Sequence, residues 1–275
     1  MAVPFLTLND QTTIPQLGFG TFKVPPQLTQ GIVEEALAAG YRHIDTATGY
    51  HNEAEVGAAI RASGIPRENL FVTTKLWNDD QKSDDWRGAY ERSLAALDID
   101  YIDLYLIHWP MPALDKYVAC WNALTTFKQE GLAKSIGVSN FLVPHLQRII
   151  EETGVVPAVD QVELHPVFQE AELRKYLDDH DITVEAWGPL GQGRYALDDY
   201  PAITNAAIAH DKTPTQIVLR WHIQSEHVVI PKASSRAHMD ENFAIFDFEL
   251  TGEEMVAITA LDTNQRLGGD PDQIN

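Results

Sequence analysis

Four residues that can hold or move a proton stand at or just beyond the ends of short apolar segments. Asp45 ends one segment, Lys75 ends the next, His108 directly follows a third, and Tyr50 lies shortly after Asp45. A lysine ammonium drawn into a cleft needs a counter-charge, which Asp45 can supply. Because an ammonium makes a nearby phenol easier to ionise, we expect the pKa of Tyr50 to fall below its usual value of ~10. The set predicts a tyrosine that protonates a forming alkoxide, with a neutral His108 hydrogen-bonded to the same carbonyl oxygen.

Each of these residues also has a purely structural interpretation. Asp45 can cap a helix, Lys75 can be a solvated strand end, His108 can be a satisfied polar group and Tyr50 can be a packing residue. If the apolar segments are parallel strands of a barrel, however, all four residues face one mouth. Convergence of four titratable groups favours the catalytic interpretation. The set contains no reductant and no nucleophile, and we predict no metal site.

The elements that must position these residues follow from the hydrophobic pattern. Short runs rich in Val, Ile and aromatic residues alternate with stretches whose apolar residues recur at helical spacing. Each strand–helix unit spans about 24–32 residues, enough for a parallel crossover. The absence of a linker rich in Pro, Gly or Ser favours one α/β domain over residues 1–275, folded as a closed (β/α)8 TIM barrel. The predicted strands are Leu17–Gly20, Tyr41–Asp45, Leu70–Lys75, Ile102–Ile107, Lys134–Val138, Ala158–Glu163, Thr183–Ala186 and His227–Pro231.

Three segments depart from this repeat. Phe5–Leu8 and Thr12–Ile14, separated by Asn9-Asp10, predict an N-terminal hairpin. A long loop is expected over Gly193–Pro201, and the tail after Leu261 is irregular. Helix-end signals occur at Gly40, Gly154, Thr213-Pro214 and the spaced pair Thr251 and Glu254.

The composition of the 275-residue chain excludes several classes of protein. Hydrophobic residues make up 44 %, enough for a large core. Lys and Arg total 20 against 40 Asp and Glu, so the formal charge is −20. Such a surface repels nucleic acid and anionic lipid, and it favours a monomer. Cys120 is the only cysteine, and its apolar helical setting predicts a buried structural thiol. The start of the sequence lacks a secretory signal, and no apolar run approaches ~18 residues, so we expect a cytoplasmic location.

Seven segments of the sequence together resemble the aldo-keto reductase family. They cover most of the chain in the family's order and spacing. WGPLGQG and the short loop after HWP are similar to those of the bacterial 2,5-diketo-D-gluconate reductases. The resemblance implies a barrel that binds NADP(H) without a Rossmann domain, and a catalytic tetrad at Asp45, Tyr50, Lys75 and His108 with Tyr50 as the acid. The segments are GYRHIDTATGY (40–50), TTKLWN (73–78), LYLIHWP (104–110), IGVSNF (136–141), QVELHP (161–166), WGPLGQG (187–193) and VIPKASS (229–235).

The same resemblance assigns a coenzyme site. Ser139, Asn140 and Gln161 match the residues that hold the nicotinamide carboxamide, and Trp187 matches the aromatic residue on which the ring stacks. Taken alone, Ser139-Asn140 would read as a helix N-cap and Trp187 as a core aromatic. A pyrophosphate loop is implied at Gly188, Leu190, Gly191, Gln192 and Gly193. The match of 191–196 to G-x-G-x-x-A is not a Rossmann fingerprint, because a loop rather than a helix is expected to follow.

The site for the 2′-phosphate of the coenzyme departs from the family's usual pattern. Lys232 matches the basic residue there, but Ala233 stands where the family commonly has Ser, and His238 where it has Arg. A neutral histidine lacks the permanent charge and fork of a guanidinium. We therefore expect NADP(H) preference with unusual tolerance for NAD(H). Compensation can come from Ser234, Ser235 and Arg236, and adenine contacts are implied at Glu241 and Asn242.

Aromatic residues line the expected substrate mouth. Phe22, Trp77 and Trp109 match pocket positions of the family, although barrel-rim packing is the structural alternative. His51 follows Tyr50 directly and can hydrogen-bond a polar substrate. The tail from Gln265 to Asn275 corresponds to the region that shapes substrate choice and carries no clear motif. The sequence therefore predicts a small-molecule carbonyl substrate without naming it.

Three other functions remain open at this point. Lys75 could form an imine in a Schiff-base aldolase. A metal hydrolase or glycosidase could use groups at the mouth, although the histidines do not show the spacing of metal ligands. Glu163 and Glu185 could form a carboxylate pair, supported only by their strand positions. A coenzyme-binding regulatory barrel without turnover is the third alternative, and the intact tetrad argues against it.

Overall fold

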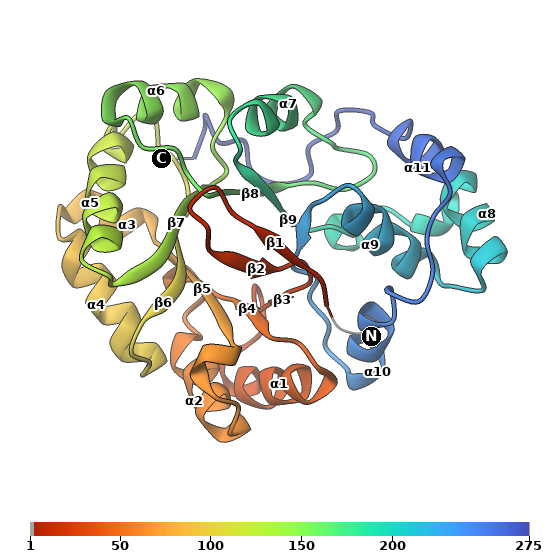
Figure 1. Cartoon of the computed structure of the whole chain (residues 1–275), viewed down its shortest axis with the longest axis horizontal. Helices are drawn as coiled ribbons and strands as arrows, with labels where there is room; N and C mark the ends of the chain where they lie inside the picture. The colour runs from red at the N-terminus through yellow and green to blue at the C-terminus, as the bar shows by residue number, and fades with distance from the viewer. Residues whose placement is uncertain (1–2, 275) are drawn as a thin grey trace.

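The computed structural model describes residues 3–274, and eight parallel strands form its centre. The sheet order runs β10-β9-β8-β7-β6-β5-β4-β3. A parallel bridge between Leu17 and Val229 joins the two outer strands, and the amide of Gly18 donates to Val229 O at 2.8 Å. The sheet is therefore closed into a barrel, which the helices surround in Figure 1. The strands are β3 (Phe19–Gly20), β4 (His43–Asp45), β5 (Phe71–Leu76), β6 (Ile102–Ile107), β7 (Ala133–Ser139), β8 (Val159–Glu163), β9 (Thr183–Trp187) and β10 (Val228–Val229).

Helices connect the strands and form the outer layer of this (β/α)8 fold. Gly40 and Gly154 end helices in the left-handed conformation, as predicted. The caps predicted at Thr213 and Thr251 also form, each with a reciprocal capping box. The helices are α1 (Pro26–Ala39), α2 (Glu53–Ser63), α3 (Asn78–Ser83), α4 (Trp86–Leu97), α5 (Tyr117–Gln129), α6 (Val143–Thr153), α7 (Ala171–Asp179), α8 (Pro201–His210), α9 (Pro214–Gln224), α10 (Arg236–Phe243) and α11 (Gly252–Thr259). Short 3-10 turns occur at Thr48–Tyr50, Arg67–Asn69, Gly191–Gly193 and Leu197–Asp199.

The predicted N-terminal hairpin, β1 (Phe5–Thr7) and β2 (Thr13–Pro15), lies across one end of the barrel (Figure 1). Asn9 donates to the carbonyl of Pro157, just before β8, and Ser135, near the start of β7, donates to Asp10. These contacts place the hairpin over the amino-terminal ends of the strands. The opposite, carboxyl end is left for the residues that can do chemistry.

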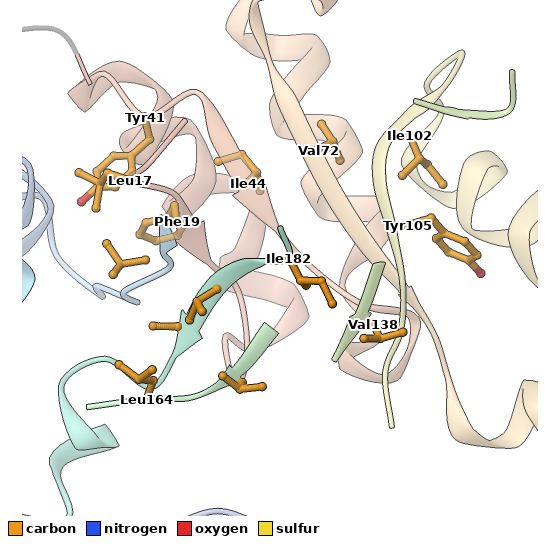
Figure 2. Close-up of a cluster of buried hydrophobic side chains, with 14 of the residues drawn as sticks. Leu17, Phe19, Tyr41, Ile44, Val72, Ile102, Tyr105, Val138, Leu164 and Ile182 are labelled. Atoms are coloured by element: carbon orange, nitrogen blue, oxygen red, sulfur yellow. The ribbon is translucent and has the colours of Figure 1, made fainter. Parts of the chain in front are cut away.

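Two hydrophobic clusters hold the barrel and its helices together. The larger packs the outer face of the strands against the helices, and Figure 2 shows part of it, including Phe19, Tyr41 and Tyr105. The smaller joins Leu8 and Ile14 of the hairpin segment to strand residues that include Leu104, Leu106 and Val159. Cys120 is buried in the larger cluster, and burial raises the pKa of its thiol to about 12, as expected for a structural cysteine. No helix within residues 3–274 combines the length and apolar character needed to cross a bilayer.

The close approach of α2 to the end of α4 generates a stability prediction. A Cβ on Gly57 would lie 2.0 Å from the backbone oxygen of Leu97. Since that oxygen cannot move without displacing α4, Gly57→Ala is expected to destabilise the fold by about 1–3 kcal/mol. Gly31→Ala is the matched control, because Gly31 lies in α1 and a Cβ there would meet nothing within 4 Å. That change should stabilise by about 0.5–1 kcal/mol. Urea unfolding of both variants measures the difference, and equal effects would contradict the packing argument.

Candidate active site

A buried ion pair stands at the carboxyl end of the barrel. Lys75 Nζ donates to Asp45 Oδ1 at 2.8 Å and to Oδ2 at 2.7 Å, and to the carbonyl of Thr46 at 2.9 Å. The Lys75 side chain is 0 % exposed and that of Asp45 is 2 % exposed. Adjacent strands β4 and β5 carry the two residues, with Asp45 in register with Thr73, two residues before Lys75. The predicted ammonium–carboxylate pair is therefore present, and its hydrogen bonds are satisfied.

Lys75 is held in its charged form. Burial lowers the pKa of the amine, but the charge and hydrogen bond of Asp45, together with the charges of Tyr50 and Glu185, more than offset this effect and the net shift is upward. An ammonium that donates to a carboxylate and a carbonyl has no lone pair with which to attack a carbonyl carbon. This environment disfavours the Schiff-base alternative.

Tyr50 lies in the 3-10 turn after β4, with its hydroxyl oxygen 3.5 Å from Lys75 Nζ. Its ring contacts Phe22 and His108, at centroid distances of 5.0 Å and 5.6 Å. The predicted lowering of its pKa is wrong for this structure: burial raises the pKa of Tyr50 to about 12, and the Lys75 ammonium offsets only part of that effect. The side chain is partly open to the mouth. Tyr50 is consequently protonated at neutral pH, which is the state that a proton donor requires.

His108 follows β6 and faces the same space. Burial, reinforced by the Lys75 charge, holds the pKa of its imidazole well below the usual 6.5, so the ring is neutral as predicted. The ring packs edge-on against Trp77 at 5.0 Å and stacks on Trp109 at 6.4 Å. Its Nδ1 is buried and has no hydrogen-bond partner among residues 3–274. The neutral ring lies beside the Tyr50 ring, and a neutral imidazole can donate an N–H to a carbonyl oxygen.

The residues assigned to the nicotinamide form a second hydrogen-bonded group beside the ion pair. Ser139 Oγ donates to the carbonyl of Gln161 at 2.7 Å. Asn140 Nδ2 donates to the carbonyl of His108 at 3.0 Å, and Asn140 Oδ1 accepts from Trp187 Nε1 at 2.8 Å. Gln161 Nε2 donates to Asp45 Oδ2 at 2.8 Å. The structure thus brings these four predicted residues together with the tetrad.

The loop after β9 has the backbone expected of a phosphate-binding turn. Gly188, Gly191 and Gly193 all have positive φ, at 60°, 67° and 71°. A side chain at Gly191 would lie 2.0 Å from the ring of Tyr195, so this position requires glycine. Leu190 packs against the hydrophobic core, and Gln192 is exposed. The next α-helix, α8, begins only at Pro201, which agrees with the exclusion of a Rossmann fingerprint.

The residues assigned to the adenine end of the coenzyme gather around the start of α10. Lys232, Ser234 and His238 are exposed, whereas Asn242 is buried. Ser235 caps α10 by accepting from the amide of His238 at 3.3 Å. Glu241 accepts from Thr213 Oγ1 at 2.6 Å, so one of its oxygens is occupied by the residue that caps α9.

The expected substrate residues lie around Tyr50 and His108. Phe22 is 44 % exposed at the rim, and Trp77 and Trp109 are half-buried. Gly49 lies against Trp77, where a Cβ would approach the indole to 2.5 Å. His51 is exposed, with a positive φ of 56°.

Two carboxyl groups have roles that sequence reasoning did not identify. Glu163 accepts from the backbone amides of Leu267 and Gly268, both at 2.7 Å, and fastens the tail beside Trp187. Glu185 instead accepts from Gln161 Nε2 at 3.0 Å inside the barrel. Their partners differ, and this does not favour a shared glycosidase role. Glu163 lies two residues after Gln161 on β8, and Glu185 lies two residues before Trp187 on β9. Because residues two apart on a strand point to the same face, this spacing was the signal in the sequence that could have identified them.

A parallel barrel whose mouth holds a half-buried tyrosine beside a buried lysine–aspartate pair and a buried histidine defines a class of carbonyl-reducing proteins. The family model for "Aldo/keto reductase family" matches residues 16–263, and the chain belongs to this family. It is 49 % identical over 269 residues to methylglyoxal reductase DkgA of Yersinia pestis, covering 98 % of this chain and 96 % of that protein. The corresponding protein of Escherichia coli K12 is 47 % identical over 268 residues, with 98 % and 97 % covered.

Solved structures agree with the fold. An aldo/keto reductase from Brucella melitensis has a TM-score of 0.90 and 51 % identity, covering 95 % of this chain and 100 % of its own. A mutant of Gox0644 in complex with NADPH has a TM-score of 0.95 and 44 % identity, with both chains fully covered.

The ion pair generates a prediction with a pH signature. Asp45→Asn leaves the buried Lys75 ammonium without its counter-charge, and we expect the free energy of unfolding to fall by about 3–5 kcal/mol. With Asp45 gone, burial lowers the folded pKa of Lys75 below its unfolded value of ~10.4. The unfolded state then binds more protons, so the loss is full at neutral pH and shrinks as pH rises toward 10.

Urea unfolding of Asp45→Asn between pH 7 and pH 10 measures this effect. The double variant Asp45→Asn with Lys75→Met serves as control, because it removes both charges and should recover part of the lost stability without the pH dependence. A single variant as stable as the wild type at pH 7 would refute the electrostatic account.

Proposed function

We propose that this protein is an NADP(H)-dependent carbonyl reductase that converts aldehydes or ketones to alcohols, with Tyr50 as general acid. The observation that carries the proposal is the Tyr50 hydroxyl 3.5 Å from a fully buried Lys75 ammonium, itself paired with Asp45. A phenol that is protonated at rest and lies beside a fixed positive charge is a proton donor whose conjugate base is stabilised on site. Membership of the aldo/keto reductase family supports the same chemistry.

The side chains beside the tetrad fit a nicotinamide. Gln161 Oε1 accepts no hydrogen bond from the part of the chain that the structure describes, so it can accept from the carboxamide nitrogen, and Ser139 and Asn140 lie next to it. Trp187 offers a half-buried indole for stacking. The positive-φ glycines at 188, 191 and 193 let backbone amides approach a pyrophosphate. The NADPH complex of the Gox0644 mutant supports this choice of coenzyme.

The residues of the chain have separate roles in the reduction. When bound, NADPH would supply the hydride for the new C–H bond at the carbonyl carbon. Tyr50 gives its phenolic proton to the carbonyl oxygen, which becomes the alcohol, and Lys75 stabilises the resulting phenolate. The alkoxide oxygen is a stronger base than the phenolate, so the raised pKa of Tyr50 does not prevent transfer. His108, whose ring is neutral, orients the carbonyl oxygen.

We propose a small dicarbonyl compound as the substrate class, with methylglyoxal and 2,5-diketo-D-gluconate as candidates. The relatives named methylglyoxal reductase support this choice, as does a mouth lined by Phe22, Trp77 and Trp109. We further propose that residues 1–275 act as one catalytic domain, as a monomer in the cytoplasm. The formal charge of −20 disfavours self-association.

The proposal is tested by following NADPH absorbance with methylglyoxal, diketogluconate, simple aldehydes and α-keto esters. We expect turnover with at least one of them, and Tyr50→Phe should reduce kcat about 10²–10⁴-fold, because general acid catalysis contributes that much. Coenzyme titration by fluorescence should give the same Kd for Tyr50→Phe and the wild type, since the hydroxyl faces the substrate.

Two results would count against this function. Unchanged turnover in Tyr50→Phe would remove Tyr50 from its role. Tight NADPH binding with no turnover of any carbonyl in the panel would favour the regulatory-barrel alternative.

A second prediction concerns the choice of coenzyme. The wild type should have a higher kcat/KM with NADPH than with NADH, but His238→Arg should widen that ratio about tenfold, because a guanidinium adds a charge-assisted hydrogen bond to the 2′-phosphate. Gly31→Ala, whose added Cβ would meet nothing within 4 Å, provides the control and should leave the ratio unchanged. A wild-type preference for NADH would reverse the proposed order.

A further inference from the structure

The interior of the barrel below the mouth holds a carboxyl group that the proposed reaction does not use. Glu185 lies on β9 in register with Gln161 on β8, and the two side chains meet at 3.0 Å between Glu185 Oε2 and Gln161 Nε2. Glu185 is 0 % exposed and Gln161 is 2 % exposed. The same Gln161 nitrogen also donates to Asp45 Oδ2 at 2.8 Å. One side-chain amide is therefore held between two carboxyl groups.

We propose that Glu185 is a positioning residue that fixes the amide of Gln161 with its nitrogen on the two carboxyl groups and its oxygen free for the coenzyme carboxamide. This inference rests on the proposed function, because it needs a nicotinamide at the mouth. In this account Glu185 touches neither coenzyme nor substrate. It determines that the oxygen of the Gln161 amide, and not its nitrogen, faces the coenzyme.

The surroundings of Gln161 dictate which way its amide points. Asp45 is ion-paired with Lys75, and as a carboxylate it only accepts hydrogen bonds. The nitrogen of Gln161 must then face Asp45, and Glu185 takes a hydrogen bond from the same nitrogen. A flipped amide would lose both bonds and place Gln161 Oε1 against the oxygens of Asp45 and Glu185. Two acceptors thus lock an orientation that a single one would hold more weakly.

Glu185 can accept from Gln161 whether or not it carries a proton. Burial, followed by repulsion from Asp45, raises the pKa of Glu185 to about 8. Its Oε1 makes no hydrogen bond among residues 3–274 and lies 3.6 Å from His43 Nε2. Burial lowers the pKa of His43 to about 3, so its ring is neutral, and its Nε2 pairs with Thr73 Oγ1 at 3.0 Å. A proton on Glu185 Oε1, the oxygen that Gln161 does not use, leaves Oε2 as an acceptor for Gln161.

A buried carboxyl group at this place costs stability, so packing does not explain it. Transfer of an ionisable group into an apolar interior is unfavourable, and well-packed apolar replacements are often neutral or stabilising. The folded state holds a proton on Glu185 that the unfolded chain has lost above pH ~4.5, and this lowers stability as pH rises toward 8. The titratable groups facing Glu185 are His43 and Asp45 on β4, Lys75 on β5, and Tyr50 above them.

The test compares three variants by NADPH titration, followed by quenching of tryptophan fluorescence, and by thermal unfolding. In Glu185→Met the amide of Gln161 loses one anchor, and we expect the Kd for NADPH to rise about 3–10-fold, the worth of one hydrogen bond. The Tm of Glu185→Met should equal or exceed that of the wild type, with a gain that grows from pH 5 to pH 8. Glu185→Gln keeps an acceptor oxygen and should bind NADPH within about twofold of the wild type. Gln161→Leu should weaken binding, and adding Glu185→Met to it should cause no further loss.

Specific results would overturn the inference. Wild-type affinity in Glu185→Met would do so, as would an additive effect of Glu185→Met in the Gln161→Leu background. A parallel loss of Tm and affinity in both Glu185 variants would show a merely structural role. If Glu185→Met does not fold, Glu185→Leu takes its place. Failure of the proposed function has a different signature, because the wild type itself would then either not bind NADPH or bind it without reducing any carbonyl compound.

Discussion

The ion pair between Lys75 and Asp45 is the interaction on which the rest of the site depends. An ammonium and a carboxylate removed from water are stable only when each satisfies the other's hydrogen bonds. Here Lys75 reaches both oxygens of Asp45 and the carbonyl of Thr46, and Gln161 supplies a further donor to Asp45. Because β4 and β5 hold the pair in register, a shift of one strand against the other would leave a buried charge unpaired. A change in the mouth that separated Lys75 from Asp45 would therefore also lower the stability of the barrel.

Much of the fold follows from sequence because the physical signals are local. The Ile102–Ile107 prediction matches β6 residue for residue, since every residue of the run is buried, Asp103 included, and no exposed position blurs its ends. Predicted strand 227–231 shrinks to β10 at Val228–Val229. Leu17, predicted to begin the first strand, lies outside β3 and makes only an isolated bridge to Val229 of β10. Where the first and last strands of the barrel meet, the strand ends depend on how the barrel closes. Closure involves residues far apart in the sequence, so the local hydrophobic pattern does not predict it. Helix ends such as Gly40 were predictable because a left-handed cap depends on one residue.

The site divides in the same way between what sequence reveals and what it does not. The positions of Asp45, Lys75 and His108 follow from the rule that barrel chemistry lies at strand ends. The direction of the pKa shift at Tyr50 does not, because it depends on how far water is excluded by rings that come from distant loops, among them Phe22. The sequence predicts that Tyr50 lies near the Lys75 ammonium, which lowers its pKa. The burial that raises the pKa of Tyr50 depends on how the residues of the mouth pack in the folded protein.

The apolar packing at the amino-terminal end of the barrel explains why the charged groups near the mouth interact strongly. The hairpin inserts Leu8 and Ile14 into the amino-terminal end of the barrel, where they pack on Leu104, Leu106 and Val159. These apolar side chains keep water out of the barrel interior at the amino-terminal ends of the strands. The charged groups nearer the carboxyl ends therefore lie in a medium of low polarity. That medium strengthens the attraction of Lys75 for Asp45, and it also keeps a proton on Glu185. The hairpin, remote from any reacting atom, therefore sets the electrostatic conditions under which a phenol can hold and release its proton.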